Sequence, residues 1–220
     1  MATDETKRDP RTVWLKRVRL SFTEALKDKQ KSSDSDDAKE KHSCNVIIEQ
    51  VGDDAKAKAM APINIKTAIG AIEAASEKMW KDKDRWKSIQ EDAPKRICFR
   101  RGERFKNKEG KVYAGYEGNF GLTASGPSAG QKRPKLLDRH KRDVTENDIL
   151  DVMYGGSYAD VLVSFYGTDK GSSGVFASIE LIRSHQEGEA MGGGVVINDA
   201  VLAEIDDLDD DMPAADDFGV

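Results

Sequence analysis

Two β-rich runs near the end of the chain restrict most strongly the folds that it can adopt. They cover residues 153–167 and 174–183, and a polar, glycine-containing segment of six residues joins them. Within the first run, Val161, Val163 and Phe165 fall on one face, and Leu162, Ser164 and Tyr166 on the other. Such alternation around a short turn predicts a β-hairpin with one buried and one wet face. We therefore expect a protein organised around a sheet.

Other extended segments are predicted earlier in the chain. Residues 12–22 place Trp14, Val18, Leu20 and Phe22 on one parity and Arg17, Arg19 and Ser21 on the other, which indicates a half-buried strand with a cationic face. Further strands are expected at residues 42–50, 95–101, 112–124 and 135–143. The polar residues 27–43 and the Gly, Pro and Ser residues of 125–131 predict loops.

The hydrophobic period changes between residues 63 and 90. Apolar residues recur there every three or four positions, with lysines and acids between them. This spacing predicts a long amphipathic helix that begins after Pro62, ends before Pro94 and is broken near residues 81–83. Trp86 is expected in the core, because an apolar stripe at this spacing is usually a packing surface.

Charge is divided between two parts of the chain. Residues 199–220 carry nine acidic side chains and no Lys or Arg, whereas residues 1–198 carry 35 basic and 31 acidic ones. A block of like charges repels itself and typically serves as an interaction tail. The simpler interpretation, a solubilising tail, stays open at this point.

The positive charge concentrates in residues 95–142, which hold 14 basic and four acidic side chains among 48 residues. Phe99, Phe105, Tyr113, Tyr116 and Phe120 lie between them. Single-stranded nucleic acid favours this mixture, because cations neutralise phosphates while flat rings stack on unpaired bases. Duplex binding requires the charge without so many rings.

The sequence offers poor material for catalysis. His42, His140 and His185 are scattered without metal-ligand spacing, and Gly192-Gly-Gly194 is not followed by the Lys-Ser/Thr of a phosphate loop. We expect no enzymatic activity, no catalytic residue, no metal and no cofactor. The two cysteines, Cys44 and Cys98, are expected to be reduced and buried, and no apolar run approaches the roughly 18 residues of a membrane span.

Five short motifs then give the sequence a family resemblance. They are Val18-Arg-Leu-Ser-Phe22, Tyr116-Glu-Gly-Asn-Phe120, Tyr154-Gly-Gly-Ser-Tyr158, Val163-Ser-Phe-Tyr166 and Gly188-Glu-Ala-Met-Gly-Gly193. Their order and spacing resemble the single-stranded DNA-binding proteins of tailed bacteriophages, and the acidic end that closes on Asp216-Asp217-Phe218 matches that family's tail. The resemblance covers roughly residues 11–194.

The resemblance implies a mainly β fold, an OB-fold-like barrel with one long helix inserted and a disordered acidic tail. The division expected is a disordered N-terminus at residues 1–10, a DNA-binding domain at 11–194 and a flexible tail at 195–220. It also implies DNA replication and recombination in the host cytoplasm, with polymerase, helicase or nuclease partners bound through the tail.

From charge and aromatic content we predict two sets of site residues. The DNA-binding set comprises Arg17, Arg19, Arg100, Arg101, Tyr113, Tyr116, Phe120, Lys132, Arg133, Lys135, Arg139, Arg142, Tyr158 and Tyr166. The partner-binding set comprises Asp209, Asp210, Asp211, Asp216, Asp217 and Phe218. Two alternatives remain open at this point: a strand-annealing recombination protein that uses the same residues, and a protein-interaction adaptor whose tail mimics DNA.

Overall fold

The protein is built around a β-barrel. The computed structural model describes residues 8–31 and 38–191. Five strands form the barrel: β1 (Thr12–Ser21), β4 (Ser43–Ile48), β6 (Phe120–Ser125), β8 (Tyr158–Thr168) and β9 (Gly174–Gln186). They pair in the order β6-β4-β1-β8-β9, and a parallel contact between Ser125 of β6 and Ser178 of β9 closes the ring. This closure confirms the predicted OB-fold-like class.

Two short strands extend the barrel. β5 (Phe99–Arg101) pairs with β6, and β7 (Lys135–Leu137) pairs in parallel with β9. A separate pair, β2 (Gln30–Lys31) and β3 (Glu40–Lys41), forms the stem of the loop predicted at residues 27–43. The short helices α1 (Glu24–Lys27) and α4 (Ile149–Val152) and the 3₁₀ turns η1 (Pro94–Arg96) and η2 (Gly102–Arg104) connect these elements.

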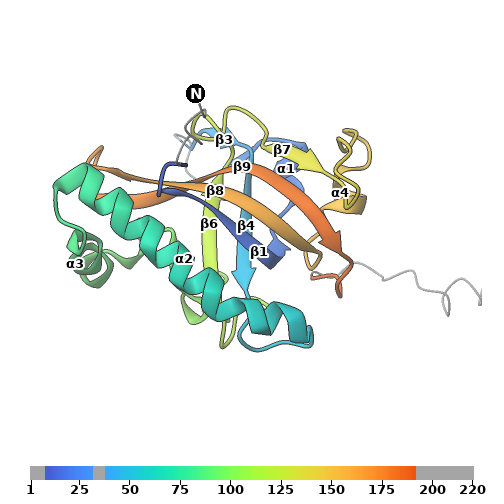
Figure 1. Cartoon of the computed structure of the whole chain (residues 1–220), viewed down its shortest axis with the longest axis horizontal. Helices are drawn as coiled ribbons and strands as arrows, with labels where there is room; N and C mark the ends of the chain where they lie inside the picture. The colour runs from blue at the N-terminus through green and yellow to red at the C-terminus, as the bar shows by residue number, and fades with distance from the viewer. Residues whose placement is uncertain (1–7, 32–37, 192–220) are drawn as a thin grey trace, which may run out of the picture.

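The hairpin of β8 and β9 confirms the predicted β-hairpin with one buried face. Val161, Val163 and Phe165 are fully buried, whereas Leu162, Ser164 and Tyr166 face outward. The two strands are the longest in the sheet, and they cross the molecule together in Figure 1. Burial of one complete side-chain row fixes the pairing register, because a shift by one residue would expose that row.

Because of a β-bulge in β1, Trp14 lies on the opposite side of the strand from the one that was predicted. The register to β8 shifts between Leu15 and Val18, and Arg17 adopts a left-handed backbone with a φ of 50°. The extra residue puts Leu15 in the core together with Val18 and turns Trp14 outward, so the prediction of one unbroken parity was wrong. Phe22, just after the strand, also faces solvent.

The predicted long helix consists of two helices. α2 (Ala55–Trp80) ends where Lys81 adopts a left-handed conformation, and α3 (Arg85–Asp92) follows with Trp86 buried as predicted. Figure 1 shows α2 lying across β1 and β8. The predicted start was wrong: Asp54 caps the helix by accepting from Ala57 N at 2.6 Å, and Pro62 lies inside it. Proline there removes one intrahelical hydrogen bond without ending the helix.

The predicted strands of the basic region are shorter in the structure. Residues 95–101 form η1 and then β5, residues 112–124 yield strand only from Phe120 onward, and residues 135–143 yield β7 followed by a turn. Gly115 and Gly118 adopt positive φ angles of 78° and 73°, which bend the backbone between Val112 and Phe120 into successive turns. Residues 102–119 therefore form a connection that folds back onto the barrel.

Cys44 and Cys98 are free and buried as predicted, and burial raises the pKa of each thiol to about 12. Among the described residues no helix has the length and apolarity required to cross a bilayer. The predicted tail at 195–220 and residues 1–7 of the predicted N-terminus lie outside the described residues.

Candidate nucleic-acid interface

The outer face of β4 and β6 is the part of an OB-fold that ordinarily holds oligonucleotides, because these are the second and third barrel strands. Cys44, Val46, Leu122 and Ala124 point into the core. The residues between them point outward: Ser43, Asn45, Ile47, Gly121, Thr123 and Ser125. Small and polar side chains thus line most of this face.

One end of the face is covered by residues 102–119. Phe105 and Tyr116 stack at 4.6 Å between ring centroids and pack with Ile47 in a second small core. A Cβ atom at Gly121 would collide with the ring of Phe105, so glycine lets both rings lie directly on the strand. Burial raises the pKa of Tyr116 to about 12, and Asn45 donates to its hydroxyl at 3.1 Å.

Two exposed aromatic rings lie beside this cluster. Phe22 is 43% and Tyr113 37% exposed, and their centroids are 5.0 Å apart with an interplanar angle of 84°. Tyr113 belongs to the predicted set, but Phe22 does not. Phe22 was left out because it falls on the parity of residues 12–22 that was expected to be buried. The chain turns at Phe22, which has a left-handed φ of 54°.

Arg100 lies on the same outer face. Its guanidinium carbon is 4.5 Å from the centroid of Phe105, and Nη2 donates to the hydroxyl of Thr123 at 3.4 Å. Burial lowers the pKa of this guanidinium, and no described carboxylate forms an ion pair with it. Arg101 next to it is exposed and lies 4.6 Å from the ring centroid of Phe120, which itself stacks on Phe99. Arg100 is therefore a cation held over a ring and available to a phosphate.

A basic rim of Lys29, Lys41 and Lys132 adjoins one end of the face. The loop after β6 returns to the β3–β4 junction, where His42 N donates to Gly130 O at 2.8 Å and Gly126 N donates to His42 O at 2.8 Å. Lys29 Nζ reaches Gln131 Oε1 at 3.4 Å, which joins the two loops. The predicted residue Lys132 is exposed in this rim, whereas Arg133 is paired with Glu146 at 2.8 Å.

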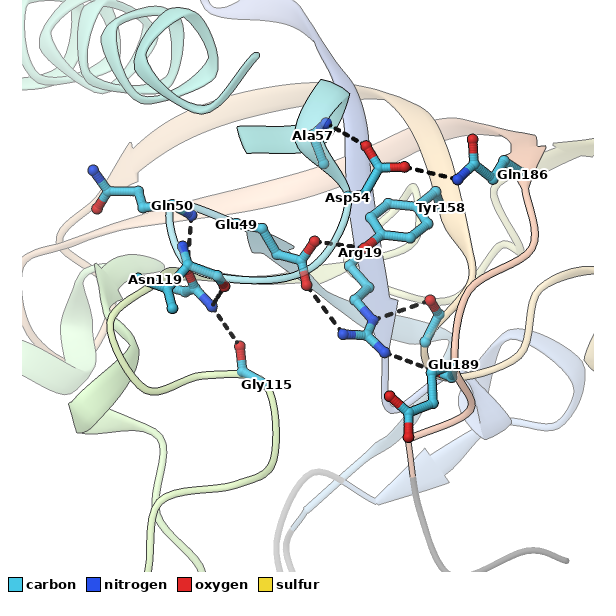
Figure 2. A network of polar contacts seen from close by, with 12 residues as sticks. Arg19, Glu49, Gln50, Asp54, Ala57, Gly115, Asn119, Tyr158, Gln186 and Glu189 are labelled. Atoms are coloured by element: carbon cyan, nitrogen blue, oxygen red, sulfur yellow. Dashed lines mark hydrogen bonds and ion pairs between the residues drawn. The ribbon is translucent and has the colours of Figure 1, made fainter. Parts of the chain in front are cut away.

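The polar groups of Arg17, Arg19 and Tyr158 are bonded to other protein groups, although we predicted DNA contacts for all three. Arg19 lies opposite Ile47 of β4 and Tyr158 opposite Arg19, so both are on the outward side of the barrel next to this face. Figure 2 shows Arg19 surrounded by protein acceptors: Nη1 pairs with Glu49 at 3.0 Å, Nη2 donates to Glu189 O at 2.6 Å and Nε to Gly156 O at 3.1 Å. Tyr158 is buried and donates its hydroxyl to Glu49 at 2.6 Å. Arg17 pairs with Asp54 at 3.3 Å and donates to Gln186 at 2.7 Å.

This network has a structural consequence. Gln50 N and Val51 N donate to Asn119 Oδ1 at 2.7 and 2.8 Å, and Asn119 Nδ2 donates to Gly115 O at 2.9 Å (Figure 2). The loop after β4 is thereby bonded to residues 115–119 and, through Arg19, to Glu189 in the segment after β9. Fully paired buried groups of this kind hold loops in one arrangement. We name the set Arg19, Glu49 and Tyr158 the buried triad.

The remaining predicted residues lie on other parts of the surface. Tyr116 and Phe120 pack against neighbouring rings, so neither offers a free face to a base in this structure. Lys135, Arg139 and Arg142 lie on β7 and the turn after it, where Lys135 pairs with Asp143 and Arg142 with Asp138. Tyr166 is exposed on the β8–β9 hairpin next to Phe176. The structure thus unites Arg100, Tyr113 and Phe22 and separates them from Lys135, Arg139 and Arg142.

Among residues 8–31 and 38–191, no group of three or more His, Cys, Asp or Glu side chains has an arrangement that could hold a metal ion. The arrangement of rings, hydroxyls and cations is that of a binding surface.

Comparison with known proteins identifies a family model and a relative that each match most of the chain. The family model described as Enterobacter phage Enc34, ssDNA-binding protein, matches residues 11–213. "Putative protein p50" of Acyrthosiphon pisum secondary endosymbiont phage 1 is 33% identical over 198 residues, which cover 89% of this chain and 93% of the relative.

Solved structures share the fold at low sequence identity. The single-stranded DNA-binding protein from bacteriophage Enc34 in complex with ssDNA aligns with a TM-score of 0.59 and 16% identity, over 82% of this chain and 89% of that chain. A second structure of the single-stranded DNA-binding protein from bacteriophage Enc34 also aligns with a TM-score of 0.59 and 16% identity, over 86% of this chain and 89% of that chain.

Proposed function

The chain belongs to the family of phage single-stranded DNA-binding proteins represented by that of Enterobacter phage Enc34, and from this premise we propose that it binds single-stranded DNA with little sequence preference. We assign this function to residues 11–194. The binding surface is the outer face of β4 and β6. The observation that carries the assignment is the exposed pair Phe22 and Tyr113, which adjoins the stacked rings of Tyr116 and Phe105, with Arg100 over the Phe105 ring.

In this mechanism the protein binds passively and catalyses no reaction. Bases stack on the free faces of Tyr113 and Phe22, and any base can do so because every base has a flat face. Arg100 and the lysines of the basic rim neutralise phosphates and release counterions. The hydroxyl and amide groups of Thr123 and Asn45 offer hydrogen bonds to sugar or phosphate oxygens. The biological role that we infer is protection of single strands during phage replication and recombination in the bacterial cytoplasm.

A titration with a fluorescent oligo-dT and a matching duplex tests this function. We expect strong preference for the single strand, because a duplex does not expose base faces to Tyr113 and Phe22. Affinity should fall with salt at a logarithmic slope of about 0.7 per phosphate contacted. Equal affinity for the duplex, or an affinity that does not change with salt, would exclude the mechanism. Absence of binding to either oligonucleotide would favour the adaptor alternative.

For the acidic segment we propose two roles. Residues 195–220 compete with DNA for the basic face, and on displacement they bind replication proteins through Asp209, Asp210, Asp211, Asp216, Asp217 and Phe218. The proposal is supported by the opposite charges of the two segments. Residues 199–220 carry nine acidic side chains, and residues 95–142 carry a net charge of ten positive charges.

Deletion of residues 199–220 should tighten binding to oligo-dT, and the gain should diminish at high salt because the competition is electrostatic. The matched variant Phe218→Ala keeps every charge, so its DNA affinity should equal that of the full chain while binding to polymerase, helicase or nuclease weakens. Unchanged or weaker DNA binding after deletion, measured by fluorescence anisotropy, would contradict the competition.

A further inference from the structure

A second groove lies on the outer face of β1, β8, β9 and β7, on strands other than β4 and β6. It has a volume of about 380 Å³, and its lining residues are Trp14, Lys16, Leu137, Lys141, Asp160, Leu181 and Arg183. Neither Trp14 nor Lys141 entered the predicted DNA-binding set. The groove combines an aromatic ring, aliphatic side chains and cations, and its volume lies in the range of ligand sites.

Strand register explains how these residues meet. Trp14 of β1 is opposite Leu162 of β8, which is opposite Leu181 of β9. Leu181 is opposite Lys135 of β7. The bulge after Leu15 keeps Trp14 on the outward side of this row, and Lys16 follows it in the exposed part of the bulge. The groove floor is thus apolar with an aromatic ring at one side.

The charge of the groove is positive. Asp160 is neutralised by Arg183 at 2.5 Å and accepts from Arg17 N at 3.0 Å. Within residues 8–31 and 38–191, neither Lys16 nor Lys141 forms an ion pair with a carboxylate. These two ammonium groups are therefore available to an anionic ligand.

The turn that carries Lys141 is rigidly built. Asp138 Oδ1 accepts from His140 N at 2.8 Å and from Arg142 N at 2.9 Å, and Arg142 also pairs with Asp138 through its side chain. Lys141 itself has a left-handed φ of 66°, and Leu137 bridges to Asp143 across the base of the turn. A short carboxylate side chain that bonds the backbone ahead of it holds such turns in place.

A row of residues with hydroxyl side chains runs from the second groove to the outer face of β4 and β6, although the hydroxyl of Ser178 within it is buried. Thr12 is opposite Ser164, Ser164 is opposite Ser178, Ser178 is opposite Ser125, and Ser125 is opposite Ser43. The row passes through all five barrel strands, including the parallel contact that closes the barrel. At a strand spacing of about 4.8 Å, four steps amount to roughly 19 Å. Trp14 lies two residues from one end of this row.

We infer that single-stranded DNA bound on the outer face of β4 and β6 continues around the barrel to this groove, where Trp14 stacks on a base and Lys16 and Lys141 contact phosphates. This inference rests on the proposed function and extends it. The ligand class is an unpaired nucleotide of the same strand, because a ring combined with free ammonium groups suits a base and its phosphate. The complete footprint then exceeds what the face of β4 and β6 holds alone.

The test compares oligo-dT lengths of about 6 and about 16 nucleotides, which bracket the usual footprint of one OB-fold. In the full chain, Trp14→Ala should weaken binding of the long oligonucleotide about 5- to 150-fold and change that of the short one less than about 2-fold. Trp14→Phe keeps a ring and should restore most of the loss. Lys16→Gln with Lys141→Gln should lower the salt slope by about 1.4 for the long oligonucleotide alone.

Lys58→Gln with Lys83→Gln is the matched control, because both lysines are exposed and line neither surface. It should leave both slopes near the wild-type values. The inference would be overturned if Trp14→Ala weakened binding of both oligonucleotides equally, or of neither. It would also be overturned if a peptide of residues 199–220, and not DNA, protected Trp14 from fluorescence quenchers. If the wild-type chain fails to bind the short oligonucleotide, the proposed function fails instead.

Discussion

Replacement of Arg19 by methionine is expected to lower the free energy of unfolding by about 3–5 kcal/mol, which is the usual effect of removing one partner from a buried ion pair. Glu49 is only 2% exposed, and Arg19 provides its cationic partner at 3.0 Å. Methionine fills a similar volume but leaves the carboxylate with a single hydrogen bond from Tyr158. Urea denaturation followed by tryptophan fluorescence measures the change.

The double variant Arg19→Met with Glu49→Gln is the control for this prediction. It removes the uncompensated charge, so it should recover much of the lost stability. Because Arg19 donates to protein oxygens through all three nitrogens, the folded variant should bind short oligo-dT as the wild type does. A stability loss below about 1 kcal/mol, the range of solvent-screened surface pairs, would contradict the role of the buried triad.

Loss of Tyr113 is expected to weaken binding of a short oligo-dT by about 1–3 kcal/mol, the usual contribution of one base stacked on an aromatic side chain. Phe22→Ala should have an effect of similar size, because its exposed ring adjoins Tyr113 at 5.0 Å. The two effects should not add fully, since each ring positions the other through their edge-to-face contact. Fluorescence anisotropy with labelled oligo-dT gives both affinities.

Two further variants make this result specific. Tyr113→Phe retains the ring and should bind nearly as the wild type does. Tyr166→Ala removes a tyrosine that is 36% exposed, about as much as Tyr113, but lies on the β8–β9 hairpin; short-oligonucleotide affinity should stay unchanged. If Tyr166→Ala and Tyr113→Ala weaken binding equally, the outer face of β4 and β6 is not the primary site.

Local patterns in the chain were sufficient to predict the main elements. The alternation of Val161, Val163 and Phe165 predicted the β8–β9 hairpin, and the three- and four-residue spacing with Trp86 predicted the helical region and its break near Lys81. The motif resemblance predicted the family and the OB-fold-like class. The boundaries of the helices were predicted less accurately. Pro62 was expected to precede the helix but lies inside α2, because the Asp54 side chain caps the helix and lets it begin earlier in the chain.

Individual site residues could not be assigned in this way. Tyr113 and Tyr116 lie three residues apart in the same basic segment, yet one is exposed and the other is buried under Phe105. Arg19 and Arg100 both lie in strands that were predicted from the sequence. Arg19 forms an ion pair with Glu49, whereas Arg100 has no described carboxylate partner. Which ring or cation is free depends on contacts with residues distant in sequence.

The sequence by itself therefore determined the type of structure and the type of ligand. Periodicity, charge content and aromatic content are properties of neighbouring residues, and they already indicated a sheet with a helical region and a surface suited to single strands, while the motif resemblance implied the β-barrel. The tertiary structure alone decided which of the aromatic and basic residues are exposed and which are buried. The bulge after Leu15, the fold-back of residues 102–119 and the closure between β6 and β9 each depend on long-range packing. In the resulting structure Phe22 and Tyr113 are exposed, Trp14 is turned outward and partly exposed, and Tyr116 and Tyr158 are buried.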